Sequence, residues 1–351
     1  MKFLKGLAIF LLLLILAYFL GPRPSTPKYS LALPNVPAEP AALLDYISKN
    51  EAVHHLKPDN EARVIWFNDS LKNKTEYAVV YLHGFSASQE EGDPVHYSFA
   101  QQFGCNLYLS RLAEHGIDTT EPLRNFTADG LWESAKQAYA IGKQLGKKVI
   151  LLSTSTGGTV ALKLAAEYPD IAGLILLSPN IAINDPNAWL LNNHWGLQIA
   201  KMIKGNYITA GDTTKAYAQY WNYKYRIEST VQLEELLESS MKASTFQKVK
   251  QPVLLLYYFK DEKNQDPVVK VSAMQRMFKQ LGTPDSLKKE IALPNPGGHV
   301  IGSYLKSKDI ESVEKACEEF GEKILGLPKA YIVAPSSNYL MPGDTLKPSP
   351  M

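Results

Sequence analysis

The stretch Ile150–Thr159 (ILLSTSTGGT) decides the fold, because an apolar run changes within a few residues into small polar residues and glycines. We interpret it as a strand that turns sharply into a helix, with Ser155 at the turn. Small residues around such a turn let the strand and the helix approach, so that the serine projects as a nucleophile. Ser153 stands where such turns usually have glycine, and Gly157 supplies space after the serine. The alternative is a Ser/Thr/Gly-rich turn that only caps a helix.

Short apolar runs rich in β-branched and aromatic residues predict strands on both sides of this turn. The predicted strands are 63–68, 77–83, 105–110, 148–153, 172–178, 252–258 and 289–293. Helical periods at 127–145, 157–167, 268–281 and 309–325 lie between or after them. Continuous apolar runs are typical of parallel strands that are buried on both faces. The alternation predicts an α/β fold with a mainly parallel sheet flanked by helices.

Residues 181–250 break this alternation. They contain Trp189, Trp195 and Trp221, three of the five tryptophans of the chain, and a helical pattern at 231–241. We predict that they form a helical cap inserted over the sheet. The aromatic side chains form either the cap's own small core or a surface that lines a substrate site, and the pattern leaves both open.

The N-terminal residues 1–20 combine Lys2 and Lys5 with an uncharged apolar run. They predict a signal peptide or an uncleaved signal anchor, and the lack of a small-residue cleavage pattern favours the anchor. The positive-inside rule then places the catalytic domain outside the cytoplasm, with membrane contact through this segment. Cleavage would instead give a secreted or periplasmic protein.

The remaining boundaries follow from composition. Residues 21–40 carry six prolines and predict an extended linker. Residues 327–351 are rich in proline and serine and predict a disordered tail. Residues 41–326 are left for one domain. The formal net charge of +2, from 37 basic and 35 acidic residues, argues against a nucleic-acid partner.

A second chemical motif ends the predicted strand at 77–83. His83-Gly84-Phe85 follows it, and a loop of this kind can present a backbone N–H group to a developing oxyanion. We expect Phe85 to supply this donor and Thr156, at the start of the next helix, to supply another. His83 itself is expected to be structural.

These motifs, with an aspartate and a histidine late in the chain, resemble the α/β-hydrolase superfamily. The similarity covers roughly residues 60–325 and is strongest to the carboxylesterases, monoacylglycerol lipases and lysophospholipases. The order Ser, acid, His in this fold implies that His299, in the segment 295–300, is the general base. The acid is Asp261 or Asp266, and the Val-Val pair after Asp266 favours the latter. Asp266 before a proline is also a good helix cap.

The resemblance implies a serine hydrolase of small-molecule carboxylic esters, with lipid-like or acylglycerol esters among the candidates. It implies no metal and no organic cofactor. One alternative is another acyl-transfer enzyme with the same triad, such as a thioesterase, an acyltransferase or a peptidase. The other is a non-catalytic binding protein, because a fold alone does not establish an activity. Protein partners are not predicted.

Overall fold

A seven-stranded sheet forms the centre of the computed structural model, which describes residues 2–209 and 212–330. Its spatial order is β1-β3-β2-β4-β5-β8-β9, and every pair is parallel except β1 with β3. The strands are β1 (Arg63–Ile65), β2 (Thr75–Leu82), β3 (Asn106–Leu109), β4 (Gly146–Thr154), β5 (Ile171–Leu177), β8 (Val253–Tyr258) and β9 (Lys288–Leu293). The predicted mainly parallel α/β sheet is confirmed.

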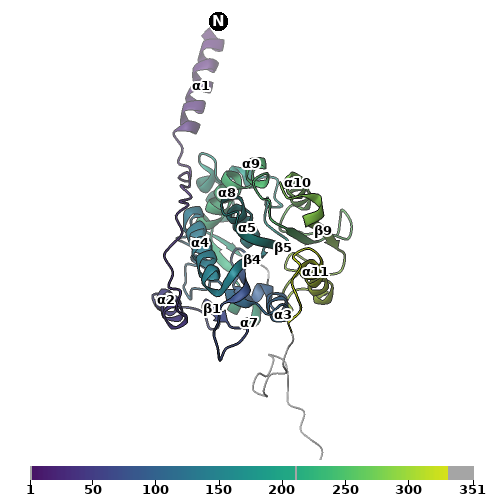
Figure 1. Ribbon diagram of the computed structural model, residues 1–351. Coiled ribbons are helices and arrows are strands. Elements are labelled where there is room, and N and C mark those ends of the chain that lie inside the picture. Colours follow the sequence, from purple (N-terminus) through teal and green to yellow (C-terminus); the bar gives the residue numbers. More distant parts are fainter. Residues whose placement is uncertain (1, 210–211, 331–351) are drawn as a thin grey trace, which may run out of the picture.

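Both faces of the sheet are covered, which explains the continuous apolar runs (Figure 1). One face packs against α4 (Ala128–Leu145), α5 (Thr156–Glu167) and α10 (Val271–Gln280), the other against α3 (Val95–Gln102) and α11 (Ile310–Lys323). Val80 and Leu151 point to the first core, while their neighbours Val79 and Ile150 point to the second. Four of these helices were predicted, and α3 was not.

The insertion between β5 and β8 is more mixed than the predicted helical cap. It contains η2 (Ala188–Leu190), α6 (Gly196–Lys204), β6 (Tyr207–Thr209), α7 (Lys215–Tyr220), β7 (Lys224–Arg226), α8 (Glu228–Ser240) and α9 (Ala243–Phe246). β6 and β7 form a separate two-stranded antiparallel sheet. Helix α8 is anchored to the domain, because Leu236 and Leu237 join the core of α4 and α5. Trp221 is buried, whereas Trp189 and Trp195 are exposed.

The first helix, α1 (Lys2–Phe19), projects away from the domain (Figure 1), and its C-terminal end contacts the insertion, where Ala17 O accepts a hydrogen bond from the Trp195 indole at 2.9 Å. Within the described residues, no helix combines the length and the apolar character that crossing a membrane requires. The prediction of a signal anchor with an extracytoplasmic domain is therefore wrong. The 18 residues of α1 span about 27 Å, less than the hydrocarbon core of about 30 Å, and they include Lys2 and Lys5.

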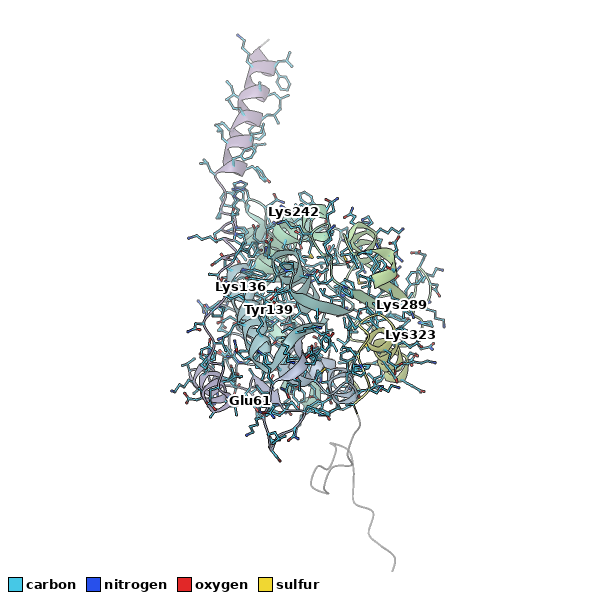
Figure 2. The ribbon with its side chains drawn as sticks, in the orientation of Figure 1. Glu61, Lys136, Tyr139, Lys242, Lys289 and Lys323 are labelled. Atoms are coloured by element: carbon cyan, nitrogen blue, oxygen red, sulfur yellow. The ribbon has the colours of Figure 1, made fainter. Side chains whose placement is uncertain are left out.

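The proline-rich segment after α1 is extended, and it is bound along the surface of α4. The backbone N–H groups of Lys28 and Tyr29 both donate to the Asp129 carboxylate, at 2.9 Å. In return, the buried Trp132 indole and the Lys136 ammonium group donate to backbone carbonyls at residues 30 and 32 (Figure 2 labels Lys136). Helix α2 (Pro40–Ala52), capped by the Glu39 side chain, follows this segment. The predicted tail at 327–351 lies mostly outside the described residues.

Candidate active site

Ser155 sits at the turn between β4 and α5 in a strained conformation, with φ 53° and ψ −119°. Backbone hydrogen bonds fix the turn. Ser155 N donates to Leu177 O, at the end of β5, at 3.0 Å, and Ser155 O accepts from Gly158 N at 2.9 Å. A Cβ atom at Gly157 would lie 1.9 Å from Leu82 O, so only glycine allows this approach of helix to strand. Such strain at one serine, fixed by its surroundings, is typical of a functional position.

Ser153 replaces the usual glycine of this turn without loss of space. Its side chain is fully buried, and its hydroxyl donates to Ile175 O on the neighbouring strand at 3.3 Å. The departure from the familiar pattern is therefore accommodated by a hydrogen bond within the sheet.

His299 lies in the loop after β9, and its Nδ1 is 2.7 Å from Asp266 Oδ2. Asp266 follows β8 and is buried, and its Oδ1 accepts hydrogen bonds from Val268 N and Val269 N. Burial opposes ionisation of Asp266, yet the charge and hydrogen bond of His299 and the two backbone donors lower its pKa. Burial likewise opposes the charge on His299, but Asp266 and the nearby Glu91 raise its pKa above the ordinary value.

Asp261, the alternative acid, is placed elsewhere. Its exposed carboxylate accepts from Lys263 N and from the backbone and side chain of Asn264, all at 2.9 Å. The structure thus brings Asp266 to His299 and leaves Asp261 closing its own turn.

A cavity of about 1170 Å³ lies beside Ser155 and His299. Ser155, Thr156, Phe85 and His299 all line it. Most of its lining residues come from the insertion, and many of these are apolar, including Leu190, Leu191, Ile199, Ala200, Ile203, Ile208 and Leu233. Another part of its wall is polar, with Glu91, Asp212, Tyr217 and Lys306. Lys306 forms an ion pair with Asp212.

Phe85 and Thr156, the two expected oxyanion donors, both line the cavity beside Ser155. Thr156 is the first residue of α5, so its N–H belongs to the helix donors that have no partner within the helix. The loop before Phe85 is braced by His83, whose Nε2 accepts from Leu112 N at 3.0 Å. The other ring nitrogen, Nδ1, then carries the hydrogen and donates to Gly84 O at 2.9 Å. Burial lowers the pKa of His83 well below its ordinary value, which keeps it neutral.

Sequence reasoning missed Glu91. It lies in η1 (Gln89–Gly92), is buried, lines the cavity, and accepts a hydrogen bond from Gly84 N at 2.5 Å. The only available signal was a pair of acidic residues directly after the Phe85 loop. Among the described residues, no cluster of three or more His, Cys, Asp or Glu side chains is placed to hold a metal ion.

The model of the family described as serine aminopeptidase S33 matches residues 74–299. The chain belongs to this hydrolase family. The match runs from β2 through the Ser155 turn to His299, so it contains the fold and the site just described. Membership agrees with the resemblance to α/β hydrolases, which is confirmed.

The relatives within and around this family include lipases. The chain is 30% identical over 108 residues to a thermostable monoacylglycerol lipase from Bacillus sp. (strain H-257), a match to 31% of this chain and 42% of that relative. The aligned part is therefore less than half of the relative's length.

Among solved structures, one of the metagenome-derived lipolytic enzymes LipS and LipT superimposes with a TM-score of 0.60, at 16% identity, covering 76% of this chain and 98% of that one. A monoacylglycerol lipase from Paleococcus ferrophilus gives a TM-score of 0.54, at 16% identity, covering 74% and 97%. At these identities the similarity shows the fold alone.

Proposed function

We propose that this S33 family member is a serine hydrolase of carboxylic esters, with Ser155 as nucleophile, His299 as general base and Asp266 as the acid. The hydrogen bond between His299 and Asp266, facing the same cavity as the strained Ser155, is the observation that carries the proposal. An Asp-oriented imidazole beside a serine is the arrangement that activates a hydroxyl group for acyl transfer.

The reaction has two halves. His299 takes the proton of the Ser155 hydroxyl as Ser155 attacks the ester carbonyl, and Asp266 stabilises the resulting imidazolium. The N–H groups of Phe85 and Thr156 stabilise the tetrahedral oxyanion, where one such donor contributes about 3–4 kcal/mol in known enzymes. His299 then returns the proton to the leaving alcohol. Water, activated by the same imidazole, hydrolyses the acyl-enzyme and frees Ser155.

The cavity supports an ester with an apolar acyl group. Its apolar wall from the insertion suits a hydrocarbon chain, because burying each methylene group contributes about 0.8 kcal/mol. Its polar part, with Asp212, Tyr217 and Lys306, suits a small hydroxylated leaving group. The similarity to monoacylglycerol lipases supports the same class, so lipid-like and acylglycerol esters are the proposed substrates.

The proposal is tested by labelling the purified protein with a fluorophosphonate, followed by peptide mass mapping and assays with p-nitrophenyl esters. We expect the adduct on Ser155, with labelling abolished in Ser155→Ala and slowed at least about 10³-fold in His299→Ala. Matched acyl thioester, ester and aminoacyl-anilide substrates separate the other acyl-transfer activities. A folded protein that neither reacts with the probe nor hydrolyses any of these substrates would refute the proposal and favour a binding role.

A further inference from the structure

Glu91 is a carboxylate in the cavity that the proposed reaction does not use. Its side chain is only 2% exposed, and it reaches from η1 back to the loop that follows β2. The bond from Gly84 N to Glu91 Oε2 is 2.5 Å long. Gly84 directly precedes Phe85, the proposed oxyanion donor, and it also borders Ser155: a Cβ at residue 84 would lie 2.9 Å from Ser155 Cβ. The carboxylate therefore holds the His83–Gly84 peptide unit, which directly precedes the Gly84–Phe85 unit that carries the Phe85 N–H.

The insertion reaches the same carboxylate from the opposite side. The side chain of Trp221, which is buried and lines the cavity, donates a hydrogen bond to Glu91. The next residue, Asn222, donates its backbone N–H to Ser86 O at 2.7 Å. Glu91 thus joins the oxyanion loop to the insertion, and its hydrogen bonds are made to the protein.

Three titratable groups face Glu91 from the surrounding elements. His299 lies across the cavity with Asp266 behind it, Tyr81 comes from β2, and Tyr217 comes from α7. The imidazole of His299 is the group that becomes cationic during the reaction. Burial of Glu91 is the main cause that raises its pKa to about 7, and the charge of His299 partly opposes this rise.

We propose that Glu91 is a positioning residue for the hydrolase reaction, which fixes the His83–Gly84 peptide directly before the Phe85 donor and, in its ionised form, supports the imidazolium of His299. This inference rests on the proposed function. A role as a substrate anchor is the competing interpretation, and the hydrogen bonds that Glu91 already makes to Gly84 and Trp221 disfavour it. The two roles differ in what they change: positioning acts on kcat, and anchoring acts on KM.

The test compares Glu91→Gln with wild type, using p-nitrophenyl butyrate. Glutamine has the same size but carries no charge, and it replaces one of the two acceptor oxygens with an NH2 group that only donates. We expect kcat to fall about 10- to 100-fold, with KM within about twofold of wild type. This decrease in kcat is smaller than the decrease caused by removing a whole oxyanion donor. Glu90→Gln is the matched control, because the adjacent Glu90 binds Tyr304 and does not line the cavity.

The pH profile gives a readout that a merely structural role would not move. In wild type, both Glu91 and His299 release protons as the acidic limb of kcat/KM rises, so we expect a limb steeper than one proton. The negative charge of Glu91 raises the pKa of His299. Removing this charge lowers that pKa, so the limb of Glu91→Gln moves to lower pH and takes a one-proton slope.

Glu91→Asp keeps the charge but shortens the side chain, and it guards against failure of the glutamine variant to fold. We expect it to lower kcat. The acidic limb of its kcat/KM profile should keep a two-proton slope and lie closer in pH to that of wild type. Active-site titration with the fluorophosphonate counts the folded, reactive molecules in each preparation. An unchanged kcat and pH profile in Glu91→Gln would overturn the inference, and so would a rise in KM alone. If wild type itself does not react, the proposed function fails instead, so the two failures are distinguishable.

Discussion

The sheet end that carries Ser155 and the insertion that covers it are held in place in different ways. At the turn, Ser153 and Thr154 are fully buried and Ser155 is 6% exposed, between ladders on both sides. In the insertion, α6 exposes Met202 and Ile203 to 82% and 68%. The proposed reacting groups thus stand on a buried scaffold, while most of the cavity wall belongs to an insertion whose helix α6 is much more exposed. This division separates the chemistry from the choice of substrate.

The largest expected effect concerns the buried scaffold. Asp266→Asn should lower kcat about 10³- to 10⁴-fold, because an amide cannot hold His299 in the tautomer that accepts the Ser155 proton. Asp261→Asn, on the same loop, should leave kcat within about twofold, since its carboxylate only closes a turn. The measurement is steady-state hydrolysis of p-nitrophenyl butyrate. Equal losses in both variants would contradict the assignment of the acid.

Stability should show the same contrast. Gly157→Ala places a methyl group against Leu82 O and should destabilise the fold by about 3 kcal/mol or more. Gly205→Ala, at the end of α6, meets no atom within 4 Å but has φ +81°, so it should cost about 1 kcal/mol. Urea unfolding followed by circular dichroism measures both. Similar midpoints would mean that the Ser155 turn yields as easily as the insertion.

Substrate choice should respond to the insertion alone. Ala200→Phe fills part of the cavity wall on α6 and should lower kcat/KM for p-nitrophenyl palmitate about 10- to 100-fold, with the butyrate ester nearly unchanged. Met202→Ala, on the same helix but outside the cavity lining, is the control. A parallel fall for the short and long esters would indicate that α6 shapes the reacting centre rather than an acyl site.

The smallest effect joins the two regions. The Tyr29 hydroxyl is 2.6 Å from Ser239 Oγ on α8, so the N-terminal segment ties the insertion to the domain. Tyr29→Phe removes this bond and should cost about 1 kcal/mol in urea unfolding, without changing kcat for the butyrate ester. Tyr18→Phe, on α1, should have no effect on either value. A kcat change in Tyr29→Phe would show that α8 transmits strain to the cavity.

Most of the fold could be predicted from the apolar runs of the strands, the helical periods between them and the residues of the Ser155 turn. The strands of the sheet are continuous apolar runs because both their faces are covered. The residues that form the Ser155 turn are adjacent in the sequence, so the turn is visible as a motif. The positions of Ser155, directly after β4, and of Asp266 and His299, in the loops after β8 and β9, were therefore accessible from the sequence. Their catalytic roles stay a proposal.

The missed features depend on contacts between residues far apart in the chain. β6 and β7 are three residues each, too short for a periodic signal, and the brief α3 follows a polar loop. From the sequence, Glu91 would be expected to be a solvent-exposed acid, and only its contacts with Gly84 and Trp221 in the folded chain show that it is buried. Likewise, the apolar run at the N-terminus has the composition of an anchor, but the helix that it forms is too short and carries two lysines.

The extended segment on α4 also decides where the catalytic domain begins. A chain shortened to start at residue 41 would remove the carbonyls that accept from the Trp132 indole and the Lys136 ammonium group. Both side chains are fully buried under this segment, and Lys136 also forms an ion pair with Glu133 at 2.9 Å. Losing each of the two hydrogen bonds to the segment should cost about 1 kcal/mol. A truncation after Gly21 keeps these acceptors. The proline-rich segment is thus part of the folded domain, and deleting it would uncover the side chains of α4 that it now covers.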